Sequence, residues 1–315
     1  MGDNFMPGVY SKRLIGMGNN MVKRWVLQAW RWVELLNPFG RPLLEGVETH
    51  ITDHCNMNCR GCSHFSPLCD PWFATPDAVM RDMKSLARLF RGVRTVRLLG
   101  GEPLLHPQIR DFLIGARHVF PKARIHLITN GLVLKKMSMS FWETCRETGV
   151  ELRMTVYPPM QSSVDECKIL CKKNGVPLVL TPSDHFFVWL DRLGQMDIQE
   201  SFKQCRKMIY CPIVKEGKLF TCAASAYISA LNRHAGLHLP EAAGLALDDE
   251  RFTGRQVLKW LNQPLALCRY CAINKELVPW KNGQPEIDDW FVGGDSGVAP
   301  MSPKVASFND QQKPK

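Results

Sequence analysis

The sequence of 315 residues predicts an α/β protein: a partial (β/α)6 barrel of the TIM type, followed by a smaller C-terminal domain with a β-hairpin and a helix. From residue 47 onward, short apolar runs rich in β-branched residues alternate with longer amphipathic stretches. This alternation is typical of parallel βαβ units with right-handed crossovers. After about residue 195 it gives way to two short strands joined by a turn, which indicates a hairpin and a second domain.

Five segments are expected to form the parallel barrel strands: residues 46–52, 95–100, 124–130, 150–156 and 176–181. Amphipathic patterns between them predict helices over residues 76–92, 108–120 and 163–175. A sixth barrel strand is expected within "DHFFVWLD" (184–191). In the C-terminal part, the hairpin is expected at 210–222 and a helix at 254–264.

The expected domain organisation has four parts: an extension over residues 1–46, the barrel over 47–199, the smaller domain over 200–290 and a flexible tail over 291–315. Within the extension, apolar residues recur at helical spacing over residues 20–36. We expect this amphipathic helix to dock against the main domain. Its tryptophans and flanking basic residues leave peripheral membrane contact as the alternative.

The composition is that of a globular protein, with 45% hydrophobic and 22% charged residues. No window approaches the roughly 18 uninterrupted apolar residues of a membrane span, and the first residues lack the apolar region of a secretory signal. A cytoplasmic protein is therefore expected, in which clustered cysteines bind metal or do redox chemistry more often than they form disulfides. The net charge of +10 is spread along the chain, so no nucleic-acid binding is expected.

Three cysteines, Cys55, Cys59 and Cys62, follow the first barrel strand within one loop. A barrel places such a loop at the carboxyl-terminal mouth of its strands, where active sites are built. Three thiolates from one loop fit a structural zinc site poorly unless Cys69 or His64 completes it, because such a site closes with four ligands. They suit an iron–sulfur cube whose fourth iron stays open. Cys69, a short distance further on, is expected to pack nearby without being a ligand.

The segment Gly100-Gly101-Glu102-Pro103 follows the second strand directly. Paired glycines let the backbone approach a ligand closely, and the Glu102 carboxylate can pair with an ammonium group. An ordinary glycine-rich turn would explain this segment alone. Such a turn is a much weaker explanation when the segment follows a CxxxCxxC loop by one βα unit.

Together, the CxxxCxxC loop and the GGEP segment resemble the radical S-adenosylmethionine (SAM) superfamily, over roughly residues 47–195. The resemblance implies that Cys55, Cys59 and Cys62 hold a [4Fe-4S] cluster whose open iron binds SAM. It further implies that one electron from the cluster cleaves SAM, and that the 5′-deoxyadenosyl radical abstracts a hydrogen atom from the substrate. The implied cofactor-binding residues are Gly100, Gly101, Glu102, Pro103, Thr129 and Asn130.

One position departs from the family pattern. The residue before the third cysteine is often aromatic in this family and packs near the adenine, but here it is Gly61. Either His64 or Phe65 replaces this contact, or the backbone alone supplies it.

Five further cysteines lie in the C-terminal third: Cys205, Cys211, Cys222, Cys268 and Cys271. Their spacing resembles the twitch domain, a truncated form of the SPASM domain of radical SAM enzymes, and implies one auxiliary [4Fe-4S] cluster. The expected ligands are Cys205, Cys222, Cys268 and Cys271. Cys211 either replaces Cys205 or is a free catalytic thiol that returns a hydrogen atom to a substrate radical. A four-cysteine zinc site is the alternative.

The remaining cysteines, Cys145, Cys167 and Cys171, lie in helical patterns and are expected to be buried and structural. Asp53 and Arg153, at predicted strand ends, are the polar residues that we expect to face the site.

The resemblance favours a dehydrogenase-type oxidoreductase that acts on a hydroxylated small molecule, a sugar or cyclitol, with an electron donor such as flavodoxin or ferredoxin. A radical enzyme that modifies peptides, as an epimerase or maturase, is the alternative. A non-catalytic iron–sulfur or zinc protein is the alternative from another class.

Overall fold

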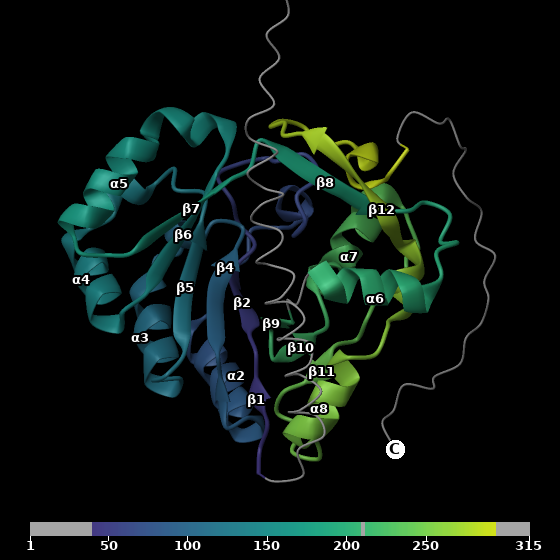
Figure 1. The fold of residues 1–315 in the computed structure, drawn as a ribbon, viewed down its shortest axis with the longest axis horizontal. Helices are drawn as coiled ribbons and strands as arrows, with labels where there is room; N and C mark the ends of the chain where they lie inside the picture. Colours follow the sequence, from purple (N-terminus) through teal and green to yellow (C-terminus); the bar gives the residue numbers. More distant parts are fainter. Residues whose placement is uncertain (1–39, 209–211, 294–315) are drawn as a thin grey trace, which may run out of the picture.

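The structure, a computed structural model that describes residues 40–208 and 212–293, contains five parallel strands where the sequence predicts them (Figure 1). They are β2 (Val47–Thr52), β4 (Thr95–Gly100), β5 (Arg124–Thr129), β6 (Glu151–Val156) and β7 (Leu178–Pro182). Each pairs in parallel with the next along the chain. The predicted α/β class with a partial barrel is confirmed, because these strands form one open sheet.

The other edge of this sheet comes from the C-terminal half of the chain. Strand β9 (Ile213–Lys215) pairs in parallel with β2, and β10 (Lys218–Phe220) and β11 (Leu245–Ala246) follow with antiparallel pairing. The β9–β10 hairpin lies where it is predicted, and its turn residues Glu216 and Gly217 both have positive φ, as a tight hairpin turn requires. The sheet order is therefore β11-β10-β9-β2-β4-β5-β6-β7. The domain boundary near residue 200 stays a prediction.

The expected sixth barrel strand at residues 184–191 is wrong. These residues do form a strand, β8 (His185–Leu190), but it pairs antiparallel with β12 (Cys271–Pro279) in a separate two-stranded sheet. Only two residues separate β7 from β8, whereas a parallel neighbour needs a crossover of about a dozen residues or more. The sixth parallel strand of the main sheet is β9, at the opposite edge.

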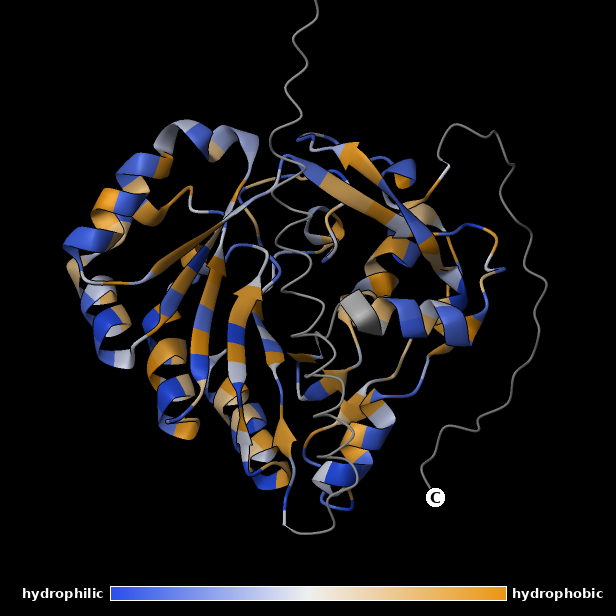
Figure 2. Cartoon of the chain, in the orientation of Figure 1, coloured by the Kyte–Doolittle hydropathy of each residue, from blue (hydrophilic) through white to orange (hydrophobic). Residues whose placement is uncertain are grey.

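Four helices cover one face of the sheet (Figure 1): α2 (Pro76–Leu89), α3 (Ile109–Val119), α4 (Met139–Thr148) and α5 (Val164–Lys173). Three of them confirm predicted helices, and α4 is an addition. Polar and apolar residues alternate along the strands (Figure 2), and the apolar ones, such as Leu98 and Leu127, join the helices in the main core. Cys145, Cys167 and Cys171 are buried in this core, as expected for structural cysteines.

The opposite face of the sheet carries polar side chains. Glu48, Arg97, His126 and Glu151 occupy neighbouring register positions on β2, β4, β5 and β6. Ion-pair contacts link them, with 3.9 Å between Arg97 and Glu48 and 3.4 Å between His126 and Glu151. Burial raises the pKa of Glu48 to about 7, although the positive charge of Arg97 opposes the shift. We call these four residues the polar row.

The C-terminal part lies on the side of the sheet away from α2 to α5 (Figure 1) and contains α6 (Ile198–Met208), α7 (Ala223–Ala235) and α8 (Gly254–Leu261), the last of which is a predicted helix. A second, smaller core includes Tyr227 and Leu231 of α7.

Short elements complete the fold: β1 (Leu43–Leu44) and β3 (Gly92–Val93), which pair with each other, and the 3₁₀ helices η1 (Ser66–Leu68), η2 (Pro103–Leu105), η3 (Leu134–Lys136), η4 (Pro158–Ser163), η5 (Ala266–Tyr270) and η6 (Ile287–Trp290).

Two predicted features lie outside the described residues: the amphipathic helix at 20–36 and most of the tail at 291–315. Within residues 40–208 and 212–293, no helix has the length and hydropathy needed to cross a membrane.

The main core predicts a stability difference between two positions of α3. Phe112 is fully buried, whereas Ile114 on the same helix is 48% exposed. Phe112→Ala should lower the free energy of unfolding by about 3–5 kcal/mol because it leaves a cavity. Ile114→Ala should change it by less than about 0.5 kcal/mol. Urea denaturation measures both, and equal losses would contradict the proposed packing.

The polar row predicts a pH dependence of stability. Between pH 4.5, the usual pKa of a glutamate, and about 7, the unfolded chain releases the Glu48 proton while the folded chain keeps it. Folding stability should therefore fall as the pH rises through this window, by at most about 3 kcal/mol from this group. Glu48→Gln should remove this component, so its unfolding free energy should fall less with pH in urea titrations. The same slope in both proteins would refute the assignment.

Candidate functional site

The three clustered cysteines lie in the loop after β2, at the carboxyl ends of the parallel strands. Cys59 is buried, and Cys55 and Cys62 are partly buried. Burial chiefly raises the pKa of Cys55 to about 12, and the charges of Glu102, Cys62 and Cys59 add to the shift. Burial likewise raises the pKa of Cys59 to about 11, with a contribution from Cys62. The three sulfurs are close enough to interact, and binding of a metal would displace protons from them.

Two glycines bring the end of β4 against the backbone that leads into the cysteine loop. The N–H of Gly101 donates to the Thr52 carbonyl, and that of Glu102 donates to the His54 carbonyl, both at 2.8 Å. A Cβ atom at Gly100 would lie 1.9 Å from the Thr52 oxygen, and one at Gly101 would lie 2.3 Å from the His54 oxygen. The two glycines therefore allow the backbone at the end of β4 to lie directly against the backbone that leads into the cysteine loop.

The Glu102 carboxylate connects the ends of β4 and β5. It is fully buried and accepts hydrogen bonds from the Thr129 hydroxyl (2.7 Å) and from the backbone N–H groups of Asn130 (2.7 Å) and Leu104 (2.9 Å). Burial raises its pKa to about 7 against the effect of these three bonds. Pro103 is buried beside it, as the first residue of η2.

Asn130 links this group to the cysteine loop. Its side-chain amide donates to the Asn56 side chain at 2.8 Å, and its nitrogen lies 3.9 Å from the Cys55 sulfur. The cysteine loop with Cys55, Cys59 and Cys62 and the predicted cofactor-binding residues thus form one contiguous site.

Residues 280–290, which the sequence analysis missed, pack directly on the cysteine loop. The Arg60 N–H donates to the Lys281 carbonyl (3.0 Å), and the Arg60 side chain pairs with Asp289 (2.8 Å). Trp280 and Trp290 donate their indole N–H groups to the Cys59 sulfur (3.3 Å) and the Cys62 carbonyl (2.8 Å). The local sequence of this segment carries no motif that predicts the contact.

Segment 280–290 also explains the unusual Gly61. Its φ is +74°, and a Cβ atom there would lie 2.8 Å from the Asp289 carbonyl oxygen, so the backbone of this segment fills the place of a side chain. Phe65 is fully buried and stacks on Trp290, with ring centroids 5.6 Å apart. His64 instead packs edge-on against His50, with ring centroids 4.8 Å apart.

The second group of cysteines comes from four elements: Cys205 from α6, Cys222 from the N-cap of α7, Cys268 from η5 and Cys271 from the start of β12. Burial raises the pKa of Cys271 well above its usual value, with further contributions from Cys222, Cys268 and Cys205. The structure therefore brings the expected quartet together. Cys211 lies outside the described residues.

A buried polar network lies between β2, β9 and α7. Asp53 accepts hydrogen bonds from Lys215 (2.5 Å) and from the Tyr227 hydroxyl (2.7 Å), whose oxygen lies 2.5 Å from Nδ1 of His50. Because the only Tyr227 hydroxyl proton points to Asp53, its oxygen must accept the Nδ1 proton of His50. The Nε2 atom of His50 is then a bare acceptor, and it has no partner among the described residues.

The structure also describes Arg153, which was expected to face the site, and Cys69, which was expected to pack near the cysteine loop. Arg153 pairs with Glu151 at 2.9 Å, next to the polar row. Cys69 packs against the second core, and burial raises its pKa to about 12, with Asp53 as the next contributor.

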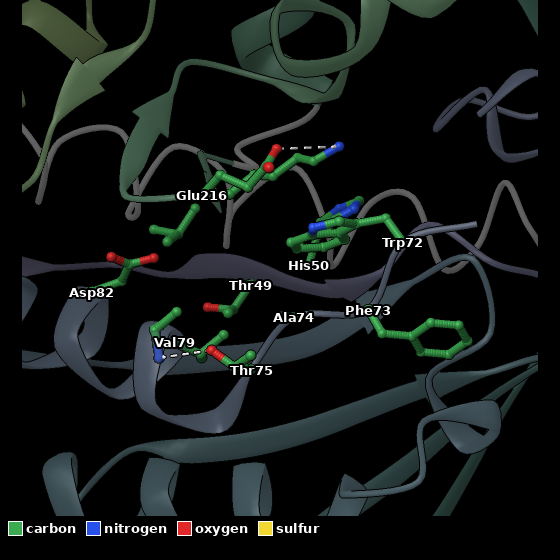
Figure 3. Close-up of a pocket in the computed structure, with 12 residues that line it drawn as sticks. Thr49, His50, Trp72, Phe73, Ala74, Thr75, Val79, Asp82 and Glu216 are labelled. Carbon is green, nitrogen blue, oxygen red and sulfur yellow. Dashed lines mark hydrogen bonds and ion pairs between the residues drawn. The ribbon is translucent and has the colours of Figure 1, made fainter. Parts of the chain in front are cut away.

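A cavity of about 290 Å³ lies beside the polar network (Figure 3). Its walls come from β2, the segment before α2, the first half of α2 and the β9–β10 hairpin, and include Thr49, His50, Trp72, Asp82 and Glu216. None of the cysteines within residues 40–208 and 212–293 lines it.

Several curated proteins resemble part of the chain. The GTP 3',8-cyclase of Mycobacterium marinum is 33% identical over 115 residues, which cover 35% of this chain and 31% of that protein. The GTP 3',8-cyclase of Aquifex aeolicus is 34% identical over 106 residues, or 32% of each chain. The chain thus spans about a third of the length of these relatives.

Solved structures of low identity are also similar. BtrN in complex with AdoMet and 2-DOIA has a TM-score of 0.45 and 14% identity, over 74% of this chain and 94% of that one. SuiB of Streptococcus suis has a TM-score of 0.39 and 11% identity, over 83% of this chain and 73% of that one.

The family model described as "Radical SAM superfamily" matches residues 49–177. This range contains most of β2, all of β3 to β6, the cysteine loop, the paired glycines with Glu102, and Thr129 with Asn130. Residues 49–177 of the chain therefore form a radical SAM domain.

Proposed function

We propose that this enzyme is a radical SAM oxidoreductase that reductively cleaves SAM and abstracts a hydrogen atom from a hydroxylated small molecule. The observation that carries the proposal is one contiguous site, in which three cysteine thiols adjoin the hydrogen-bonded group of Glu102, Thr129 and Asn130. This site lies at the carboxyl ends of parallel strands, where barrel enzymes build their active sites.

The residues present fit a [4Fe-4S] cluster. Three soft thiol ligands come from one loop, and N–H groups of Trp280 and Asn130 face two of the sulfurs, at 3.3 and 3.9 Å. When bound, the cluster and SAM supply the electron transfer and the radical chemistry. The chain supplies the ligands Cys55, Cys59 and Cys62 and a buried site that limits access of water.

We assign the cofactor-facing positions to the group around Glu102. Gly100 and Gly101 hold the strand end against the cysteine loop, and Glu102 orients Thr129 and Asn130 through its carboxylate oxygens. The negative charge of Glu102 favours the ammonium group of SAM nearby. Pro103 continues this wall as the first residue of η2.

We further propose one auxiliary [4Fe-4S] cluster, held by Cys205, Cys222, Cys268 and Cys271. The electrostatic effects of Cys222, Cys268 and Cys205 on the Cys271 thiol support the quartet. Four protein ligands would leave no iron open to substrate, so this cluster is suited to accept an electron and not to bind SAM. Cys211 stays the proposed alternative ligand or hydrogen donor.

The polar face of the sheet supports a hydroxylated substrate such as a sugar or cyclitol. Two buried atoms on this face, His50 Nε2 and His126 Nδ1, have no hydrogen-bond partner among the described residues, and Arg97 Nη1 has only its 3.9 Å ion-pair contact with Glu48. Unpartnered buried polar atoms are costly, and the hydroxyl groups of a small polar molecule would satisfy them as donors and acceptors. A flavodoxin or ferredoxin is the proposed class of electron donor.

Removal of one cluster ligand should abolish the chemistry. Reconstituted wild-type protein, incubated anaerobically with SAM and a strong reductant, should form 5′-deoxyadenosine, measured by liquid chromatography. Cys59→Ala should form none above background, because three thiolates are needed to hold the cluster. Cys69→Ala, which alters a thiol outside the ligand set, should keep the activity. Formation of 5′-deoxyadenosine by Cys59→Ala would contradict the ligand assignment.

Iron analysis should separate an auxiliary cluster from a zinc site. Reconstituted wild-type protein should hold about eight irons per chain, and Cys268→Ala about four, because each cube contains four. Elemental analysis measures iron and zinc together. About four irons in both proteins, with about one zinc in the wild type, would refute the auxiliary cluster.

A further inference from the structure

Two tryptophans of segment 280–290 donate to the cysteine loop, but to different kinds of acceptor. The Trp280 indole nitrogen lies 3.3 Å from the Cys59 sulfur. The Trp290 indole nitrogen lies 2.8 Å from the Cys62 carbonyl oxygen. Of these two tryptophans, Trp280 is the one that donates to an atom that we assign as an iron ligand.

The Trp280 indole is held in place from several sides. Its ring stacks on Tyr157, just after β6, with centroids 5.9 Å apart and planes 28° apart. Its backbone N–H donates to the Asp184 carbonyl at 2.8 Å, and Asn282, two residues on, forms a β-bridge with Cys59. The donor is therefore oriented toward the sulfur by packing and backbone pairing on both sides of the contact.

The surroundings of this contact strengthen it. Cys59 is only 6% exposed, so little water competes for its sulfur. A hydrogen bond in such a site is electrostatically stronger than one in water. Reduction of an iron–sulfur cluster adds negative charge that spreads onto its ligand sulfurs. An N–H donor at a ligand sulfur favours the reduced state, and hydrogen bonds to the sulfurs are among the factors that set the potential.

We propose that Trp280 is a positioning residue that raises the reduction potential of the SAM-binding cluster through its N–H bond to Cys59. This inference rests on the proposed function, because it needs the cluster to be held by the cysteine loop. The C-terminal segment thereby acts on the electron-transfer step from outside the radical SAM domain.

The test compares two matched variants of the reconstituted holoprotein. In anaerobic redox titrations followed by electron paramagnetic resonance, the SAM-binding cluster is the one whose signal changes when SAM is added. Trp280→Phe removes the N–H donor to sulfur and keeps an aromatic ring, so its midpoint potential should shift to a more negative value. Trp290→Phe removes a donor to a carbonyl and should keep the wild-type potential. A wild-type potential in Trp280→Phe, or an equal shift in Trp290→Phe, would overturn the proposal.

A second measurement does not depend on the stability of Trp280→Phe. Wild-type and Trp290→Phe proteins are labelled with ¹⁵N in the indole ring, and pulsed electron paramagnetic resonance is recorded on the reduced SAM-responsive cluster. Both should show coupling to one indole nitrogen. A SAM-responsive signal without this coupling overturns the role of Trp280 alone. A wild-type protein without any SAM-responsive signal overturns the proposed function and this inference with it.

Discussion

Two backbone hydrogen bonds between neighbouring strand ends determine where the cysteine loop lies. They join Gly101 to Thr52 and Glu102 to His54, and they form only because no side chain stands between the two backbones. The loop therefore leaves β2 on a path set by the end of β4. Glu102, fixed by the second bond, passes the same constraint to β5 through Thr129 and Asn130. For this reason the same backbone contacts fix the positions of the thiols and of the expected cofactor-binding residues.

The parts of the fold that follow from local pattern could be predicted from the sequence. The five parallel strands, the β9–β10 hairpin and α8 all lie where apolar periodicity and turn residues place them. The cysteine loop and the Gly100–Glu102 segment are contiguous signals of the same kind. The strand pattern of residues 184–191 does not identify β12 as the partner of β8. The short connection from the preceding strand nevertheless excludes a parallel neighbour, and the expected ranges 176–181 and 184–191 already contain this information.

The contacts around the site were less predictable than its central residues. Segment 280–290 has no motif, and its side chains acquire a role only when the fold brings them to the cysteine loop. Gly61 shows the same limit, since its departure from the family pattern makes sense only once the Asp289 backbone is seen beside it. The network of His50, Asp53 and Tyr227 joins two distant parts of the chain, so the local sequence points only to Asp53, which lies next to the cysteines.

The contact between Cys59 and Trp280 spans 221 positions of the sequence, and this separation has a consequence for the order of assembly. At the usual rates of translation, roughly 10–45 s pass between synthesis of the first residue and of the second. During that interval the cysteine loop leaves the ribosome without the segment that packs on it. Iron delivered in this period would meet thiols still open to solvent and to oxidation. The site is enclosed on this side only after segment 280–290 has been made and has packed on the loop, so the C-terminal part of the chain completes the shielding of these thiols.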